Sequence, residues 1–231
     1  PTHTTCSMYY LKLASSAGHP TAQVILGNAM LKESNERGRS IESRRDSLLG
    51  ALRLWDDSGT NEGLYNCGHV YYGGVEELGL GEDKDRAKGY FRRAAEGGDR
   101  DARYWVGVEE GKVEFVRMAA EEMHGGALHY MALYNYSNGG SPSSFASDLL
   151  LAATDGGSPD AMALIGQCHF QGEDGFDMDH SGALEWWVKA ADAGHAESAV
   201  SAGALLYNGG DGVKVDRKRA FEYYQMGGEL G

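Results

Sequence analysis

Small residues recur in pairs along this chain, and their spacing limits the folds that it can adopt. Six segments carry a small residue and a second one five positions later. The first members of the pairs are Ala22, Gly63, Ala102, Ala127, Ala161 and Ser198. The second members are Gly27, Gly68, Gly107, Ala132, Gly166 and Gly203, at successive separations of 41, 39, 25, 34 and 37 residues. Self-similarity at such a period is typical of repeat proteins, in which each repeat is one supersecondary unit.

A second pattern follows most of these segments, and its spacing is helical. Aromatic residues or leucines stand three to five positions after a leading residue, and a small pair stands at seven and eight. The leading residues are Ala87, Phe145, Ala183 and Ala220, and residues 6–18 repeat the pattern without a preceding first segment. Paired helices joined by turns therefore predict an all-α solenoid of αα-hairpins, because small residues let neighbouring helix axes approach closely.

Polar residues mark where the second helix of several hairpins should begin. Asp83, Asp179 and Asp216 each stand four residues before a leading alanine. A short carboxylate there can accept hydrogen bonds from the free amide groups of the first turn. Ser141 followed by Pro142 is expected to start a helix in the same way.

The units resemble Sel1-like repeats, a family related to tetratricopeptide repeats. The last unit carries the resemblance best, with Ser198, Gly203, Gly209, Gly212, Val213, Asp216, Ala220, Tyr223 and Gly228. The resemblance implies a right-handed superhelix that fills residues 1–231 as a single domain. Its approximate units are 6–18 (partial), 19–59, 60–98, 99–126 (irregular), 127–157, 158–194 and 195–231. Two departures stand out: residues 32–47 form a polar insertion that we expect to project as a mobile loop, and unit 99–126 is too short for a normal turn.

Composition narrows the choice of partner and compartment. The formal net charge is −13, so nucleic acid and anionic membranes are poor partners and a basic protein patch is a better one. No apolar run approaches the roughly 18 residues that span a bilayer, so we expect a soluble protein without membrane insertion. Cys6, Cys67 and Cys168 have irregular spacing. We interpret them as small buried residues in a reducing compartment, the cytoplasm or an organelle interior.

No part of the sequence carries a strong signal for a metal site or a catalytic site. Residues 177–182 resemble the opening of a calcium loop, but Val188 stands where a bidentate glutamate is required. The histidines and cysteines are too far apart in the repeat to converge on a metal ion. No nucleophile can be paired with a base from spacing. We therefore predict no metal, no cofactor and no enzymatic activity.

The resemblance to tetratricopeptide-type hairpins also predicts a concave binding face. In such hairpins, residues three before and one after the second small residue of the first helix project into the groove. The first row is Val24, Tyr65, Tyr104, His129, Ala163 and Val200. The second row is Asn28, His69, Val108, Leu133, Gln167 and Ala204. The candidate protein-binding residues are Tyr65, His69, Tyr104, Val108, His129, Leu133 and Gln167; for Tyr65 and Tyr104, packing against the adjacent repeat is the alternative.

Three functions are compatible with these observations. A scaffold or adaptor that binds partner proteins through its concave face is the leading hypothesis. The alternative is a structural subunit fixed within a larger organellar or membrane-associated complex, because both ends carry apolar residues that could dock onto it through the terminal repeats. A hydrolase is the third, since the resemblance includes proteins linked with such activity. The sequence identifies neither the partner nor the compartment.

Overall fold

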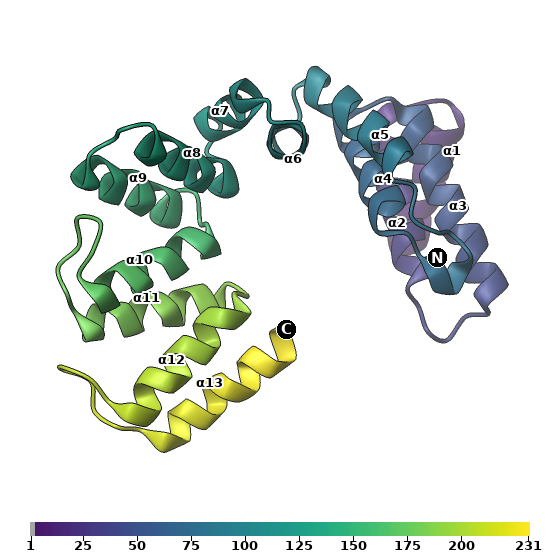
Figure 1. Ribbon diagram of the computed structural model, residues 1–231. Coiled ribbons are helices and arrows are strands. Elements are labelled where there is room, and N and C mark those ends of the chain that lie inside the picture. Colours follow the sequence, from purple (N-terminus) through teal and green to yellow (C-terminus); the bar gives the residue numbers. More distant parts are fainter. Residues whose placement is uncertain (1–2) are drawn as a thin grey trace. The chain divides into compact units, whose positions relative to one another are not determined.

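The computed structural model describes the chain from His3 to Gly231, and side-chain surroundings from Met8 onward. In this part of the chain the protein is α-helical, with one short 3-10 helix and no β-strand (Figure 1). The all-α prediction is confirmed. The helices fall into two compact units, Pro1–Phe115 and Val116–Gly231, and the division lies within α7 (Val113–Glu121).

In each unit, a first helix packs against the second helix that follows it, and successive hairpins pack in chain order (Figure 1). The N-terminal unit contains α1 (His3–Ser16), α2 (Pro20–Ser34), α3 (Ile41–Ser58), α4 (Asn61–Gly73), η1 (Glu76–Leu78), α5 (Lys84–Gly97) and α6 (Arg100–Glu109). The C-terminal unit contains α8 (Gly125–Ser137), α9 (Pro142–Thr154), α10 (Pro159–Gln171), α11 (His180–Asp192), α12 (Ala196–Asn208) and α13 (Arg217–Leu230). The hairpins are α2–α3, α4–α5, α8–α9, α10–α11 and α12–α13.

The recurring glycines are points where an aromatic ring of the second helix lies directly on the backbone of the first. The pairs are Gly27 with Trp55, Gly68 with Phe91, and Gly166 with Trp187. A Cβ atom on Gly68 would lie 2.7 Å from Cε1 of Phe91, and one on Gly166 would lie 2.6 Å from Cδ1 of Trp187. Real Cβ contacts are longer, so only glycine permits this approach of the two helices.

The α8–α9 hairpin packs its two helices closely with a different pair of residues. Ala132 stands where the others have glycine, and Leu149 stands where they have an aromatic ring. Both are buried in one apolar cluster between α8 and α9. The larger residue on the first helix is thus matched by a smaller one on the second, which conserves the volume between them.

The predicted caps of the second helices are confirmed. Oδ1 of Asp83 accepts from the amide of Arg86 at 3.0 Å, and Oδ1 of Asp216 accepts from the amide of Arg219 at 3.1 Å. Asp179 and Ser141 cap α11 and α9 in the same way. The chain turns sharply after α5, where Gly98 adopts a left-handed conformation at a φ of 101°.

The prediction of a mobile loop over residues 32–47 is wrong. α2 continues to Ser34, and α3 begins at Ile41 behind a Ser40 cap, so most of the insertion lengthens this hairpin. Arg44 explains the difference, because it is buried and its Nε donates to the carbonyl of Ser34 at 2.6 Å. Its guanidinium also pairs with Glu77 in η1. The short irregular unit is confirmed: α6 and α7 are separated only by residues 110–112.

Both cysteines whose side chains are described are free and buried, as predicted. Burial raises the pKa of the Cys67 thiol to about 12 and that of Cys168 to about 11. Both therefore stay protonated at neutral pH and are poor nucleophiles. The side chain of Cys6 lies outside the described residues. Between His3 and Gly231, no helix combines the length and apolar character that crossing a membrane requires.

Replacing a packed glycine by alanine should destabilise the protein, although alanine is the better helix former. For Gly68→Ala we expect a loss of roughly 1–3 kcal/mol in the free energy of unfolding, because the new methyl group overlaps Phe91. Gly89→Ala is the matched control: Gly89 is exposed in α5 with no atom within 4 Å of its Cβ position. The free energy of unfolding of this control should increase by about 0.5–1 kcal/mol. Urea unfolding measures both, and a Gly68→Ala protein as stable as the wild type would contradict the packing account.

Candidate protein-binding groove

Three of the predicted groove residues lie together in the C-terminal unit. His129 and Leu133 on α8 and Gln167 on α10 line one cavity of about 390 Å³. Ala163, from the same predicted rows, lines it as well. Residues at equivalent repeat positions project from the same side of successive first helices, so the repeat spacing located this surface.

A second cavity of about 310 Å³ continues this surface towards α12. Gln167, Trp187 and Ser201 line both cavities. We call the two together the groove. It crosses the first helices α8, α10 and α12, and Trp187 from the second helix α11 contributes to both of its parts.

The end of the groove near α8 is polar and acidic. Asp160 and Glu197 line it, and the side chain of Asp160 is 63% exposed. His195 accepts from the amide of Ser198 through Nδ1, so its Nε2 carries the proton in the neutral ring and faces Asp160 Oδ1 at 3.6 Å. These side chains offer negative charge and hydrogen-bond acceptors to a ligand.

His129 is the unusual member of this end. Its Nε2 atom is buried and makes no hydrogen bond among the described residues. Burial lowers the pKa of His129, and the nearby charge of Asp160 opposes this shift in part. A buried ring nitrogen without a partner costs free energy, and a ligand atom that bonded to it would recover that cost.

The other end of the groove is aromatic. Phe170 is 37% exposed, its ring centroid lies 5.4 Å from that of Trp187, and His180 stacks on it at 4.8 Å. Nδ1 of His180 accepts from the amide of Asp211, which ties the α12–α13 turn to this wall. Leu205 completes the apolar lining. Such a wall fits a large apolar side chain.

Tyr65 and His69 of the N-terminal unit form a separate cluster with Phe91. The ring centroid of Tyr65 lies 4.7 Å from that of His69 and 5.5 Å from that of Phe91, which belongs to the same hairpin. Burial raises the pKa of Tyr65 to about 12, with smaller contributions from Asp101 and Asp99. Tyr65 thus packs mainly within its own hairpin, while His69 is exposed.

The remaining predicted residues of the N-terminal unit differ in exposure. Val108 on α6 is 42% exposed and Tyr104 is half-buried. The placement of Val24 in the groove row is wrong: it is 4% exposed and packs in the core with Leu52 and Trp55. The extra length of the α2–α3 hairpin accompanies this departure from the other repeats.

The sequence prediction missed the acidic and aromatic walls of the groove. Asp160 and Glu197 each immediately precede the first small residue of their segment, so the repeat alignment contained their signal. Trp187 stands four residues after Ala183 in the pattern of the second helices, and it also lines the groove. Among the residues that the structure describes, no three His, Cys, Asp or Glu side chains converge closely enough to hold a metal ion.

The stacked hairpins and the glycine–aromatic contacts define the class of protein as an αα-hairpin solenoid. A family model described as Sel1 repeat matches residues 61–99, 159–195 and 196–231. These three segments of the chain are Sel1 repeats. Comparison with curated protein sequences finds no significant match.

Solved structures share the fold over nearly the whole chain. A Sel1 repeat protein from Oxalobacter formigenes aligns with a TM-score of 0.72 at 19% identity, covering 97% of this chain and 95% of its own. The protein c5321, a protective antigen present in uropathogenic Escherichia coli strains that displays an SLR fold, aligns with a TM-score of 0.59 at 22% identity. The alignment covers 96% of this chain and 49% of c5321. The immunity protein Pa5087 from Pseudomonas aeruginosa aligns with a TM-score of 0.64 at 14% identity, and the alignment covers 88% of this chain and 81% of Pa5087. At these identities the likeness concerns the fold.

The lowered pKa of His129 makes the stability of the protein sensitive to acid. The folded state binds the proton less readily than the unfolded state, so this contribution to stability is complete above the unfolded value of 6.5 and is lost as pH falls. The melting temperature should therefore decrease between about pH 7.5 and about pH 5.5, and less so in His129→Gln. Equal decreases in the two proteins would show that His129 is not buried as described.

Proposed function

We propose that this protein is a scaffold that binds partner proteins, and that the groove of the C-terminal unit holds one segment of a partner. In this proposal the chain acts by binding and catalyses no reaction. The observation that carries it is the continuity of the groove across three first helices, with a buried, unpartnered Nε2 of His129 at one end. The three matched Sel1 repeats support it, because repeat solenoids present extended binding surfaces.

The two ends of the groove suggest the chemistry of the bound segment. Asp160 and Glu197 favour a lysine or arginine, and the wall formed by Phe170 and Trp187 favours a large apolar side chain. The net charge of −13 would speed encounter with a basic partner. We infer that the partner segment carries a basic residue close to an aromatic or aliphatic one. In the N-terminal unit, Tyr65, His69, Tyr104 and Val108 are proposed as additional contact area.

A bulky residue in the middle of the groove should abolish binding of such a segment. Ser201 lines both cavities, so the indole in Ser201→Trp would occupy the space where they join. We expect at least about a tenfold loss of affinity, since a contact at the centre of an interface dominates its energy. Fluorescence anisotropy with labelled peptides that combine arginine and phenylalanine measures this affinity.

Ser147→Trp is the matched control. Ser147 is exposed on α9, and its hydroxyl donates to the carbonyl four residues earlier, as that of Ser201 does. This variant should bind the peptides as the wild type does. If no peptide of this kind binds the wild type, or if both tryptophan variants bind equally well, the groove is not the binding site.

A fixed subunit of a larger complex is the second candidate, and exposed aromatic residues favour it. Tyr9 and Tyr10 on α1 are 65% and 66% exposed, and Phe221 on α13 is 69% exposed. Such residues are unusual on a free surface and common in protein interfaces. Sedimentation of the purified protein tests this candidate: a species that stays monomeric at high concentration argues against an obligate assembly.

A further inference from the structure

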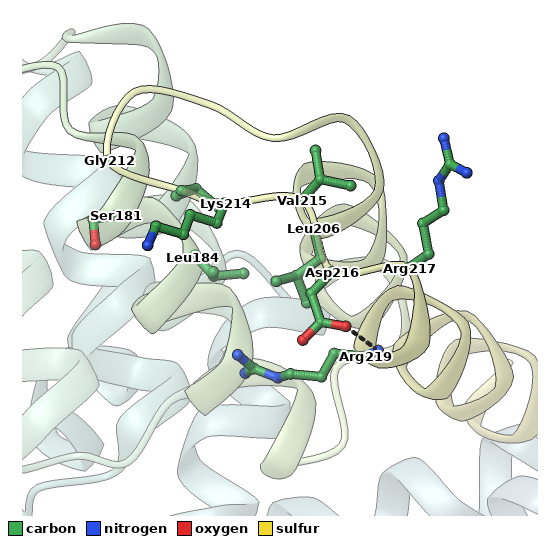
Figure 2. A pocket seen from close by; sticks show the side chains of 10 residues that line it. Ser181, Leu184, Leu206, Gly212, Lys214, Val215, Asp216, Arg217 and Arg219 are labelled. Carbon is green, nitrogen blue, oxygen red and sulfur yellow. Dashed lines mark hydrogen bonds between the residues drawn. The ribbon is translucent and has the colours of Figure 1, made fainter.

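A second cleft lies beside the turn between α12 and α13, apart from the groove (Figure 2). Its volume is about 790 Å³. The turn contributes Val213 and Lys214, the start of α13 contributes Arg219, and Leu184 of α11 and Leu206 of α12 provide apolar surface. None of these residues lines the groove.

Three cations, Lys214, Arg217 and Arg219, line this cleft. The side chains of Lys214 and Arg219 extend towards Leu184 (Figure 2), whereas the guanidinium of Arg217 lies over the ring of Tyr207, 5.6 Å from its centroid. In the described part of the chain, neither Lys214 nor Arg219 lies within ion-pair distance of a carboxylate. The carboxylate of Asp216 is engaged as the helix cap, through the amide of Arg219. The cleft therefore presents positive charge in a chain whose net charge is −13.

The fold does not require these cations, as the preceding hairpin shows. The α10–α11 turn has the same construction 37 residues earlier: Asp179 donates its amide to His169 O at 2.8 Å, as Asp216 does to Leu206 O at 2.8 Å. In that turn, Asp177 stands at the position of Lys214, and Gly182 stands at the position of Arg219. Turn formation and helix capping therefore do not explain the two positive side chains.

Apolar surface adjoins the cations. Leu206 is 2% exposed, Leu184 and Val213 are half-buried, and Val215 at the rim is 54% exposed. Along α11, Glu185 and Lys189 extend the surface beyond Leu184 with charges that balance. The cleft thus combines three cations with aliphatic side chains, which together match a ligand whose carboxylates alternate with apolar groups.

We propose that this cleft binds an acidic segment of a partner protein in which Asp or Glu residues alternate with Leu or Ile. A peptide fits better than a nucleic acid, because Leu184, Val213 and Val215 can pack against the apolar side chains of a peptide, whereas a phosphate backbone has no such groups. The proposal adds a second binding site to the scaffold and does not depend on the groove being occupied.

Charge reversal at Lys214 and Arg219 tests the proposal. The probe is a short fluorescein-labelled peptide alternating Glu with Leu, followed by fluorescence anisotropy with the full chain. We expect Lys214→Glu combined with Arg219→Glu to weaken binding at least about tenfold, because two attractions become repulsions. The same peptide with Gln in place of Glu should bind the wild type at least about tenfold more weakly. Added salt should weaken binding of the acidic peptide.

Lys218→Glu is the matched control, since it makes the same charge change at an exposed residue of α13 that does not line the cleft. Its affinity should stay within about threefold of the wild type, as expected for a more distant charge. Circular dichroism verifies folding, and if the double variant unfolds, Lys214→Gln at an exposed position should still weaken binding measurably. Unchanged binding by the cleft variants, or an equal loss of affinity in Lys218→Glu, would overturn the proposal. Equal binding of a labelled single-stranded oligonucleotide would also overturn it, because the cleft would then recognise anions without regard to class.

Discussion

The contact between a glycine on a first helix and a large ring on the following second helix is the constraint on which this structure depends. At Gly27, Gly68 and Gly166 the aromatic side chain occupies the space that a Cβ atom would need. The helices of a hairpin can therefore approach closely while a wide ring still fills the space between them. The hairpin with Ala132 and Leu149 obeys the same rule of constant volume with a different pair.

The contact between Gly166 and Trp187 also positions residues that line the groove. Gly166 packs on Trp187, and the next residue, Gln167, lines the groove beside that ring. Trp187 is 6% exposed, so it is held by the core and presents only a small part of its surface to a ligand. A binding surface fixed in this way needs little reorganisation when a partner segment is bound.

The sequence predicted the fold well because its signals are local and repeated. Small residues at fixed spacing and aspartates such as Asp83 identify helix contacts and helix starts without knowledge of tertiary structure. The sequence did not predict that Arg44 would be buried against Ser34, because that contact depends on how a long insertion folds back. For the same reason, the repeat positions predicted that His129 lines the groove but did not predict that Trp187 does, because its position depends on packing between helices.

The C-terminal unit presents two surfaces of opposite character, an acidic and aromatic groove and a basic cleft, and the groove rests on the helix spacing set by the contact between Gly166 and Trp187. A double-mutant cycle of Gly166→Ala and Trp187→Leu, followed by urea unfolding, tests this spacing most directly. If the ring and the glycine pack as described, Gly166→Ala will be destabilising beside tryptophan and much less so beside leucine, with a coupling of about 1 kcal/mol or more. Additive effects of the two substitutions would contradict the account.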